Sequence, residues 1–440
     1  MKKILVLGAG LVARPPIRYL LDQPDFNVTV ASRTMSKAEQ LIEGRPNGTA
    51  IAFDVSDLHR LEELIPQHDL AISLLPYTHH VTVAKSCLNH GKHLVTTSYV
   101  SDAMRALDGE AKAAGLLFLN EIGLDPGIDH MSAMKIIHSV QKAGGTIVSF
   151  KSYCGGLPAP EANTNPFGYK FSWSPRGVVM AGRNSARYLE DGREIKIPGE
   201  DLFSHHWMLP IEGAGDFEAY PNRDSLGYLS LYGIEKARTM FRGTLRYSGW
   251  CDTLKKIVEL GFLSDKEMEV EGLTYAGLLE RLIGKKEGDL RKNLAEFLSL
   301  DEKDAILDRM EWLGLLGGEV IPAIKSSPLD ILANRMLAKM AYAEGERDMV
   351  ILHHQFVGQF PDHTEEITST LVDFGIPHGD TSMARTVGLP AAIGARLILQ
   401  GKIKTVGVHI PASAAIYEPV LAELEGVGIS FVEKVKALKK

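Results

Sequence analysis

The chain has 440 residues, 45% of them hydrophobic and 23% charged, with a formal net charge of -7 at pH 7. This length predicts two or three domains and excludes a small peptide-like scaffold, while the composition excludes a disordered or fibrous protein. The negative charge argues against general affinity for nucleic acid or anionic membranes, and three cysteines without metal-ligand spacing indicate neither a disulfide framework nor a metal site.

The N-terminus "MKKILVLGAG" begins with basic residues and a short apolar run, as a signal peptide does. It lacks the apolar region of about 7–15 residues that a signal peptide needs. No run approaches the ~18 apolar residues of a membrane span. We therefore expect a soluble cytoplasmic protein.

The first predicted elements are a buried strand at residues 4–7, a glycine turn and a helix that begins near Pro15 and Pro16. The turn carries Gly8-x-Gly10-x-x-Ala13, a form of the dinucleotide fingerprint in which missing side chains let the backbone approach a pyrophosphate. A short glycine pattern alone often marks only a tight turn. Its place between an N-terminal strand and a helix favours a dinucleotide-binding domain.

The second predicted strand, "NVTVAS", ends at Ser32 and is followed by Arg33 and Thr34. An NAD enzyme usually has a carboxylate here, on the ribose 2′-hydroxyl. An arginine instead favours the 2′-phosphate of NADP, with the two hydroxyls as further donors. The alternative is a solvated arginine at a strand end.

Four more strands are predicted in "TAIAFDVSD", "DLAISLLP", "KHLVTTSYV" and "GLLFLNEIGLDPG", with helical patterns between them. This alternation predicts a parallel, doubly wound α/β sheet of the Rossmann type. The third strand places Asp54 near the expected adenosine position. Ligand groups should lie along the crevice at the carboxyl ends of the strands, at Leu74, Leu75, Thr96, Thr97, Ser98, Tyr99, Leu124 and Asp125.

After residue 130 the sequence becomes rich in glycine, proline and aromatic residues, which predicts strands joined by long loops. One of these strands is "AYPNRDSL". Four amphipathic patterns then predict helices, and "GLPAAIGARLILQGKI" near the end predicts another. We expect a Rossmann domain at 1–128, to which about 386–440 returns, a mixed-sheet substrate-binding and dimerisation domain at 129–250 and 317–385, and a helical insertion at 251–316.

Motifs along the whole chain resemble the saccharopine reductase family, the glutamate-forming saccharopine dehydrogenases. They are "TTSYVS", "NEIGLDPGIDH", "SYCGGLPAPE", "NPFGYKFSWS", "YPNRDS", "RGTLRY", "TSTLVDFG" and "SMARTVGLP". The resemblance implies a homodimer that uses NADPH in lysine metabolism. Such enzymes reduce the imine of 2-aminoadipate 6-semialdehyde and L-glutamate to saccharopine, or oxidise saccharopine in reverse.

The resemblance also implies which residues contact each ligand. With the glycine turn and strand ends, it gives a cofactor set of Gly8, Ala9, Gly10, Leu11, Val12, Ser32, Arg33, Thr34, Asp54, Val55, Leu74, Leu75, Thr96, Thr97, Leu124, Asp125, Pro126 and Ser174. It implies substrate contacts at Ser98, Tyr99, Asp125, Arg223, Thr244, Leu245 and Arg246.

Saccharopine carries three carboxylates, and guanidinium groups such as Arg223 and Arg246 suit them. Each arginine could instead pair with a nearby acid, such as Asp224. Asp125 is the candidate for orienting the amine or imine, and Tyr99 and Cys154 are candidate proton carriers. Cys154 is equally well interpreted as a small buried residue. We assign no role to the histidines.

Two other functions are consistent with parts of this pattern. A carboxynorspermidine-type dehydrogenase also reduces an imine, but a diamine-derived substrate should favour acidic residues in place of the two arginines. A regulatory protein that binds NADPH without turnover would keep the glycine turn alone. The direction of the reaction in the cell stays open.

Overall fold

A computed structural model describes residues 1–438 of the chain. The chain forms two compact units. The first contains residues 1–147, 358–364 and 369–440, and the second contains residues 148–357 and 365–368.

The first unit is built on a parallel sheet, as predicted. Across residues 1–438, its seven strands follow the order β17-β6-β5-β4-β1-β2-β3. Strands β1 to β6 have the order of a Rossmann sheet. In such a sheet the ligand crevice lies where the strand order reverses, which is between β1 and β4 here. The strands are β1 (Lys2–Leu7), β2 (Phe26–Ser32), β3 (Gly48–Ala52), β4 (Leu70–Ser73), β5 (His93–Thr96), β6 (Leu117–Leu119) and β17 (Gly407–His409).

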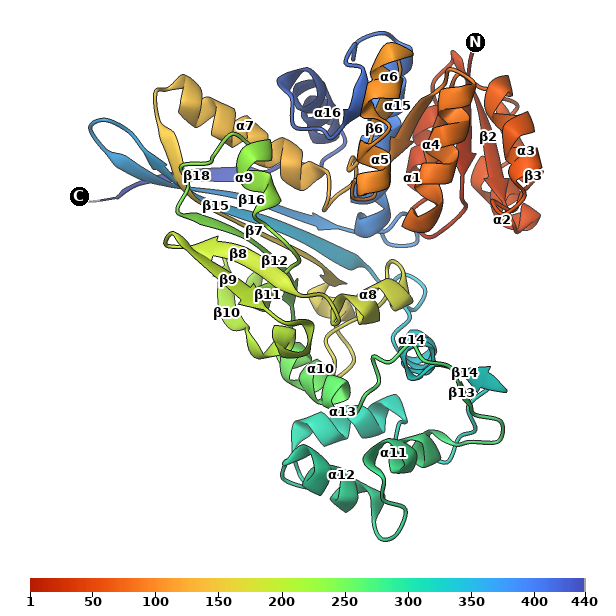
Figure 1. Cartoon of the computed structure of the whole chain (residues 1–440), viewed down its shortest axis with the longest axis vertical. Helices are drawn as coiled ribbons and strands as arrows, with labels where there is room; N and C mark the ends of the chain where they lie inside the picture. The colour runs from red at the N-terminus through yellow and green to blue at the C-terminus, as the bar shows by residue number, and fades with distance from the viewer. Residues whose placement is uncertain (439–440) are drawn as a thin grey trace. The chain divides into compact units, whose positions relative to one another are not determined.

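Helices cover both faces of this sheet (Figure 1). Apolar residues of α3, α4 and α6 form one core with alternate residues of the strands. On the other face α1 and α2 contact β2, and α15 packs against α1 and contacts β4. The helices of this unit are α1 (Arg14–Leu21), α2 (Met35–Ile42), α3 (Leu58–Leu64), α4 (His80–Asn89), α5 (Asp102–Arg105), α6 (Asp108–Ala113), α7 (Ile128–Lys142), α15 (Ser382–Leu399) and α16 (Ala414–Gly426), with short 3-10 turns at Ile65–Gln67 and Tyr77–His79.

The second sheet is mixed, as predicted. In the described residues its strand path is β10-β11-β12-β7-β15-β16-β18, with β8 and β9 branching from β12. β12 is parallel to β7 and antiparallel to β11. The strands are β7 (Thr146–Pro158), β8 (Ala186–Glu190), β9 (Arg193–Ile197), β10 (Trp207–Ile211), β11 (Gly215–Pro221), β12 (Thr239–Arg246), β15 (Asp348–Gln359), β16 (Thr364–Phe374) and β18 (Val432–Leu438).

Helices occur in the second unit where the apolar spacing predicts them. They are α10 (Trp250–Glu259), α11 (Tyr275–Ile283), α12 (Leu290–Leu298) and α13 (Ala305–Leu313). The unit also contains α8 (Pro175–Ala181), α9 (Gly227–Leu231), α14 (Pro328–Lys339) and 3-10 turns at Pro160–Ala162 and Gly199–Ser204, which the sequence patterns did not predict. A small ladder joins β13 (Met268–Glu269) to β14 (Lys325–Ser326).

Two elements differ from the sequence prediction. The expected strand "AYPNRDSL" ends at Pro221, because Arg223 has a φ of 55° and left-handed backbone cannot continue a strand. The helix expected from Gly388 begins at Ser382, where Thr381 accepts a hydrogen bond from the backbone N–H of Ala384.

Candidate functional site

The glycine turn follows β1 at the carboxyl edge of the parallel sheet. Gly8 has a φ of 113°, and a Cβ there would lie 3.0 Å from the carbonyl oxygen of Leu74. A Cβ on Gly10 would meet no protein atom within 4 Å. The first glycine therefore permits the tight turn, and the second leaves the open face that a pyrophosphate requires.

The same turn offers backbone donors. The N–H groups of Leu11 and Val12 have no protein acceptor within residues 1–438. Ala13, at the start of α1, makes no side-chain cap, and Pro15 and Pro16 occupy the first turn of the helix. Unpaired N–H groups at a helix start attract anions, so the turn fits a dinucleotide phosphate.

The end of β2 carries the residues expected at the adenosine ribose. Arg33 and Thr34 are exposed, and Ser32 Oγ accepts from the N–H of Thr34 at 3.2 Å. In the described chain Arg33 forms no ion pair. Hydrogen bonds from Ser56 lower the pKa of the exposed Asp54 carboxyl, to which the charge of Arg33 also contributes. The unpaired guanidinium suits a 2′-phosphate.

The remaining predicted cofactor residues of the first unit lie at or after the ends of β3, β4, β5 and β6, along the carboxyl edge. This set combines half-buried and fully buried side chains and comprises Val55, Leu74, Leu75, Thr96, Thr97, Leu124 and Pro126. Ser174 lies in the second unit, where its hydroxyl caps α8 by accepting from Gly177 N.

Tyr99 and Asp125 come together at this edge. The Tyr99 hydroxyl donates to Asp125 Oδ1 at 2.9 Å, and both side chains are half-buried. The adjacent Val100 N–H donates to Glu121 at 2.9 Å, and Glu121 also lies 2.8 Å from His130 Nε2. These buried contacts fix the segment that presents Tyr99, so the pair is held ready to orient a polar substrate group.

Sequence reasoning assigned no role to His80, which begins α4 and is 4% exposed. Its Nδ1 lies 2.9 Å from Ser73 Oγ, and its Nε2 lies 2.8 Å from Ser98 Oγ and 3.0 Å from Thr96 Oγ1. Burial lowers the pKa of His80 to about 4, so the ring is neutral at physiological pH. A neutral ring therefore links the ends of β4 and β5 and holds the Ser98 hydroxyl.

The buried histidines predict a loss of stability in mild acid. Burial lowers the pKa of His80 and His353 to about 4. The folded state thus binds fewer protons than the unfolded state below pH 6.5, and stability present above pH 6.5 is lost towards pH 4. By pH 4 each group should cost about 3 kcal/mol.

Chemical denaturation between pH 7.5 and pH 5 measures this effect. We expect the unfolding free energy to fall with pH, and to fall less steeply in His80→Asn. His59→Asn is the matched control because His59 is exposed. Equal pH slopes in all three proteins would contradict the account.

In the second unit, Arg246 is a buried cation without a carboxylate partner. It is 5% exposed, its Cζ lies 4.9 Å from the ring centroid of Tyr169 and 5.4 Å from that of Trp250, and its Nη1 donates to Leu245 O. Within residues 1–438 its Nε has no hydrogen-bond partner, and it forms no ion pair.

The nearest acid across the β11–β12 ladder does not compensate Arg246. Glu218 stands opposite it in register, but its two carboxylate oxygens accept from the N–H groups of Gly249 and Cys251, at 2.6 and 2.8 Å. A buried guanidinium without an anion is costly. The arrangement therefore fits a site for a ligand carboxylate.

The other predicted substrate residues lie at different positions in the second unit. Thr244 stands in register between Tyr220 of β11 and Cys154 of β7, and Cys154 is half-buried. Leu245 is fully buried. The exposed Arg223 follows the end of β11, so it is not beside Arg246 along the ladder.

The acid suggested as a partner for Arg223 is used elsewhere. Asp224 pairs with Arg187 at 2.7 Å, and the N–H of Arg187 donates to the carbonyl oxygen of Arg223.

Two protein-family models match the chain in succession. Residues 4–119 match the saccharopine dehydrogenase NADP binding domain, and residues 123–429 match the saccharopine dehydrogenase C-terminal domain. The chain belongs to the saccharopine dehydrogenase family.

Relatives in this saccharopine dehydrogenase family align along the whole chain. The NADP(+)-dependent, L-glutamate-forming saccharopine dehydrogenase of Schizosaccharomyces pombe is 44% identical over 99% of both chains. The apo structure of the L-Glu-forming saccharopine dehydrogenase from Saccharomyces cerevisiae superposes with a TM-score of 0.90 at 42% identity, and covers 99% of this chain and 100% of that one. The mitochondrial alpha-aminoadipic semialdehyde synthase of Rattus norvegicus is 38% identical over 98% of this chain but only 47% of its own length.

The two saccharopine dehydrogenase domain models divide the candidate residues as the two compact units do, except at residues 124–126, which lie in the first unit but in the C-terminal domain model. The glycine turn, Arg33, Asp54 and Tyr99 fall within the NADP binding domain. Asp125, Cys154, Ser174, Arg223 and the segment 244–246 fall within the C-terminal domain.

No helix in the described residues is both long enough and apolar enough to span a membrane. Nor does this part of the chain gather three or more His, Cys, Asp or Glu side chains into a group that could hold a metal.

Proposed function

We propose that this family member reduces the imine of 2-aminoadipate 6-semialdehyde and L-glutamate to saccharopine with NADPH, and oxidises saccharopine with NADP in reverse, in lysine metabolism. Bound NADPH supplies the hydride for the imine carbon. The observation that carries the substrate assignment is the buried, unpaired guanidinium of Arg246, which suits a carboxylate-rich ligand.

The residues of the chain bind, orient and exchange protons. Arg246 binds one carboxylate, and the exposed Arg223 binds another. Ser98, held by His80, donates a hydroxyl to a third polar group of the substrate. The negative charge of Asp125 orients the secondary amine and stabilises its protonated imine, while Tyr99 exchanges a proton through their 2.9 Å hydrogen bond.

Three other residues of the second unit have roles in this proposal. Thr244 and Leu245 line the substrate site next to Arg246 on β12. Cys154, in register with Thr244, is a second candidate proton carrier. Ser174 contributes a hydroxyl to the cofactor.

The cofactor preference follows from Arg33. Arg33→Asp should lower kcat/KM for NADPH relative to NADH by about 100-fold, because the variant loses charge-assisted hydrogen bonds to the 2′-phosphate and repels it. Initial rates with each cofactor give this ratio. Arg60→Asp serves as a matched control, since Arg60 is an exposed arginine paired with Glu63 on α3. An unchanged ratio in Arg33→Asp would refute the role of Arg33.

Further parts of the proposal are a homodimer, a cytoplasmic location, and the domain boundaries expected from the sequence, with residues 251–316 as an insertion. The free thiols of Cys87, Cys154 and Cys251 support a reducing compartment. Light scattering of the purified protein should give twice the mass of the chain. A monomer mass would contradict the dimer.

The amine partner tests the substrate assignment. NADPH oxidation should be followed with 2-aminoadipate 6-semialdehyde plus either L-glutamate or a diamine. We expect oxidation with glutamate and saccharopine as the product. Faster oxidation with the diamine would instead support a carboxynorspermidine-type enzyme, and NADPH binding without oxidation in either mixture would support a regulatory protein.

A further inference from the structure

Two of the family-like motifs have no part in the proposed ligand contacts. "TSTLVDFG", residues 368–375, contains the second half of β16, and "SMARTVGLP", residues 382–390, forms the first half of α15. α15 packs against α1, the helix that follows the glycine turn. The second motif therefore packs against the helix that follows the dinucleotide turn.

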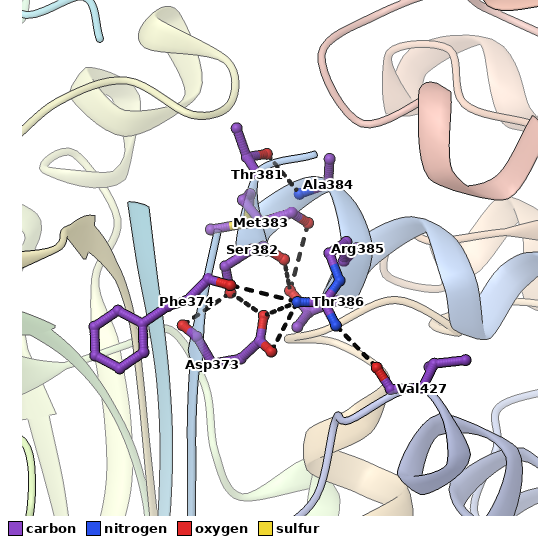
Figure 2. A network of polar contacts seen from close by, with 9 residues as sticks. All are labelled: Asp373, Phe374, Thr381, Ser382, Met383, Ala384, Arg385, Thr386 and Val427. Carbon is purple, nitrogen blue, oxygen red and sulfur yellow. Dashed lines mark hydrogen bonds and ion pairs between the residues drawn. The ribbon is translucent and has the colours of Figure 1, made fainter. Parts of the chain in front are cut away.

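A buried polar network fixes the start of α15 (Figure 2). Asp373 is 7% exposed and accepts from Arg385 Nη1 at 2.9 and 3.0 Å and from Ser382 Oγ at 2.6 Å. Arg385 also donates from Nη2 to the carbonyl oxygen of Val427 at 3.0 Å. The helix start is thus tied both to the end of β16 and to the loop after α16.

The loop before α15 adds a direct tie to α1. Asp380 Oδ1 accepts from Arg14 Nη1 at 3.0 Å, and Arg14 is the first residue of α1. The network at Asp373 and this ion pair hold the two helices in a fixed relation at their N-terminal ends.

Gly388 of α15 lies against the start of α1 and the glycine turn. A Cβ there would lie 2.4 Å from Cδ of Pro16 and 2.9 Å from the carbonyl oxygen of Val12. Neither neighbour can rotate away, because one belongs to a proline ring and the other to the backbone. Glycine is unfavourable inside a helix, so its place here indicates that the contact requires the bare backbone.

We propose that Gly388 is a positioning residue for NADPH. The helix α15, fixed by Asp373 and Arg385, packs against the glycine turn and fixes the position of its backbone. Leu11 and Val12 thereby present their N–H groups to the pyrophosphate. This inference rests on the proposed function, since it assumes that the turn binds the cofactor. It extends the cofactor site to a helix that contains none of the proposed ligand-contact residues.

The same helix provides a matched control. A Cβ on Gly394 would lie 2.8 Å from Cδ1 of Ile122 and 3.2 Å from Cδ2 of Leu119. These atoms end flexible side chains and belong to the sheet side of α15. Gly394→Ala therefore introduces a similar steric change without touching the glycine turn.

The experiment is an equilibrium fluorescence titration of the full-length protein with NADPH, without substrate. Gly388→Ala should weaken NADPH binding by roughly tenfold or more, the effect of losing about one charge-assisted hydrogen bond. Gly394→Ala should stay within about twofold of the wild type. In saccharopine oxidation at saturating NADP, kcat of Gly388→Ala should change little, so that the effect appears in KM for NADP and not in KM for saccharopine.

Wild-type affinity in folded Gly388→Ala, or an equal loss in Gly394→Ala, would overturn the inference. If Gly388→Ala does not fold, Asp373→Asn decides, because it is isosteric and loosens the fixed start of α15. It should weaken NADPH binding severalfold, and unchanged affinity would overturn the inference. Failure of the wild type to bind NADPH would overturn the proposed function as well, so the two failures are distinguishable.

Discussion

Arg246→Leu should lower kcat/KM for saccharopine by about 100-fold or more, while the protein stays folded and binds NADPH as the wild type does. Truncating one partner of a buried charge pair typically costs 2–5 kcal/mol, and here the missing partner is a substrate carboxylate. Steady-state kinetics with saccharopine and NADP, together with NADPH titration, measure both effects.

Stability should respond in the opposite direction. Without a substrate, the guanidinium of the buried Arg246 has no anion, and its Nε has no acceptor in residues 1–438. An apolar side chain removes that desolvation cost, so the unfolding free energy of Arg246→Leu should equal or exceed that of the wild type. A loss of activity with no loss of stability is the signature of a binding residue.

Arg335→Leu is the matched control. Arg335 is also buried and stacked on an aromatic ring, at 4.6 Å from Tyr275, but it donates to the carbonyl oxygen of Leu313 and pairs with Glu319 at 2.7 Å. Its removal should lower stability and leave KM for saccharopine unchanged. If Arg246→Leu instead lost stability and kept its kcat/KM, the carboxylate site would be wrong.

Asp125→Asn should lower kcat by roughly 100-fold to 1000-fold, with a smaller effect on KM. The amide keeps the shape of the side chain, but it lacks the negative charge that would stabilise a protonated imine and the basicity that a proton transfer needs. Tyr99→Phe removes only the hydroxyl that donates to Asp125 at 2.9 Å, so it should lower kcat by about tenfold.

The pH profile separates catalysis from structure. kcat of Asp125→Asn should lose part of the pH dependence that the wild type shows, because one titrating group is gone. Asp108→Asn is a control carboxylate in the first unit: Asp108 accepts from Val408 N at 3.0 Å and pairs with Lys112, at the amino end of β17. A wild-type kcat and pH profile in Asp125→Asn would exclude Asp125 from the reaction.

Much of the first unit was predictable because its signals are local. Gly8, Gly10 and Ala13 lie within one turn, and a Rossmann sheet then places the residues after each strand at one edge. The confirmed fold rests on these short-range patterns, as do the four helices between residues 250 and 313.

The contacts that escaped prediction join residues far apart in the chain. His80 meets Ser73, Thr96 and Ser98 only because β4 and β5 are neighbours, and the residues directly beside His80 in the sequence do not distinguish it from a solvated histidine. Likewise, the tight fit of Gly388 against Pro16 depends on α15 returning to α1. A histidine between hydroxyl-rich strand ends would have been the one usable signal.

Arg223 and Arg246 illustrate a different limit. Their residue type indicated carboxylate binding, but the sequence could not tell whether neighbouring acids neutralise them. In the structure Asp224 pairs with Arg187. Both carboxylate oxygens of Glu218 accept hydrogen bonds from backbone N–H groups, and Arg246 forms no ion pair in the described chain. Side-chain pairing of this kind is set by strand register.

The most direct test of the central claim is the absorbance of the reduced nicotinamide after saccharopine is added to the purified protein with NADP or with NAD. We predict rapid reduction of NADP, much slower reduction of NAD, and release of glutamate in equal amount to NADPH. No reduction of either cofactor, in a protein that binds NADPH tightly, would contradict the account.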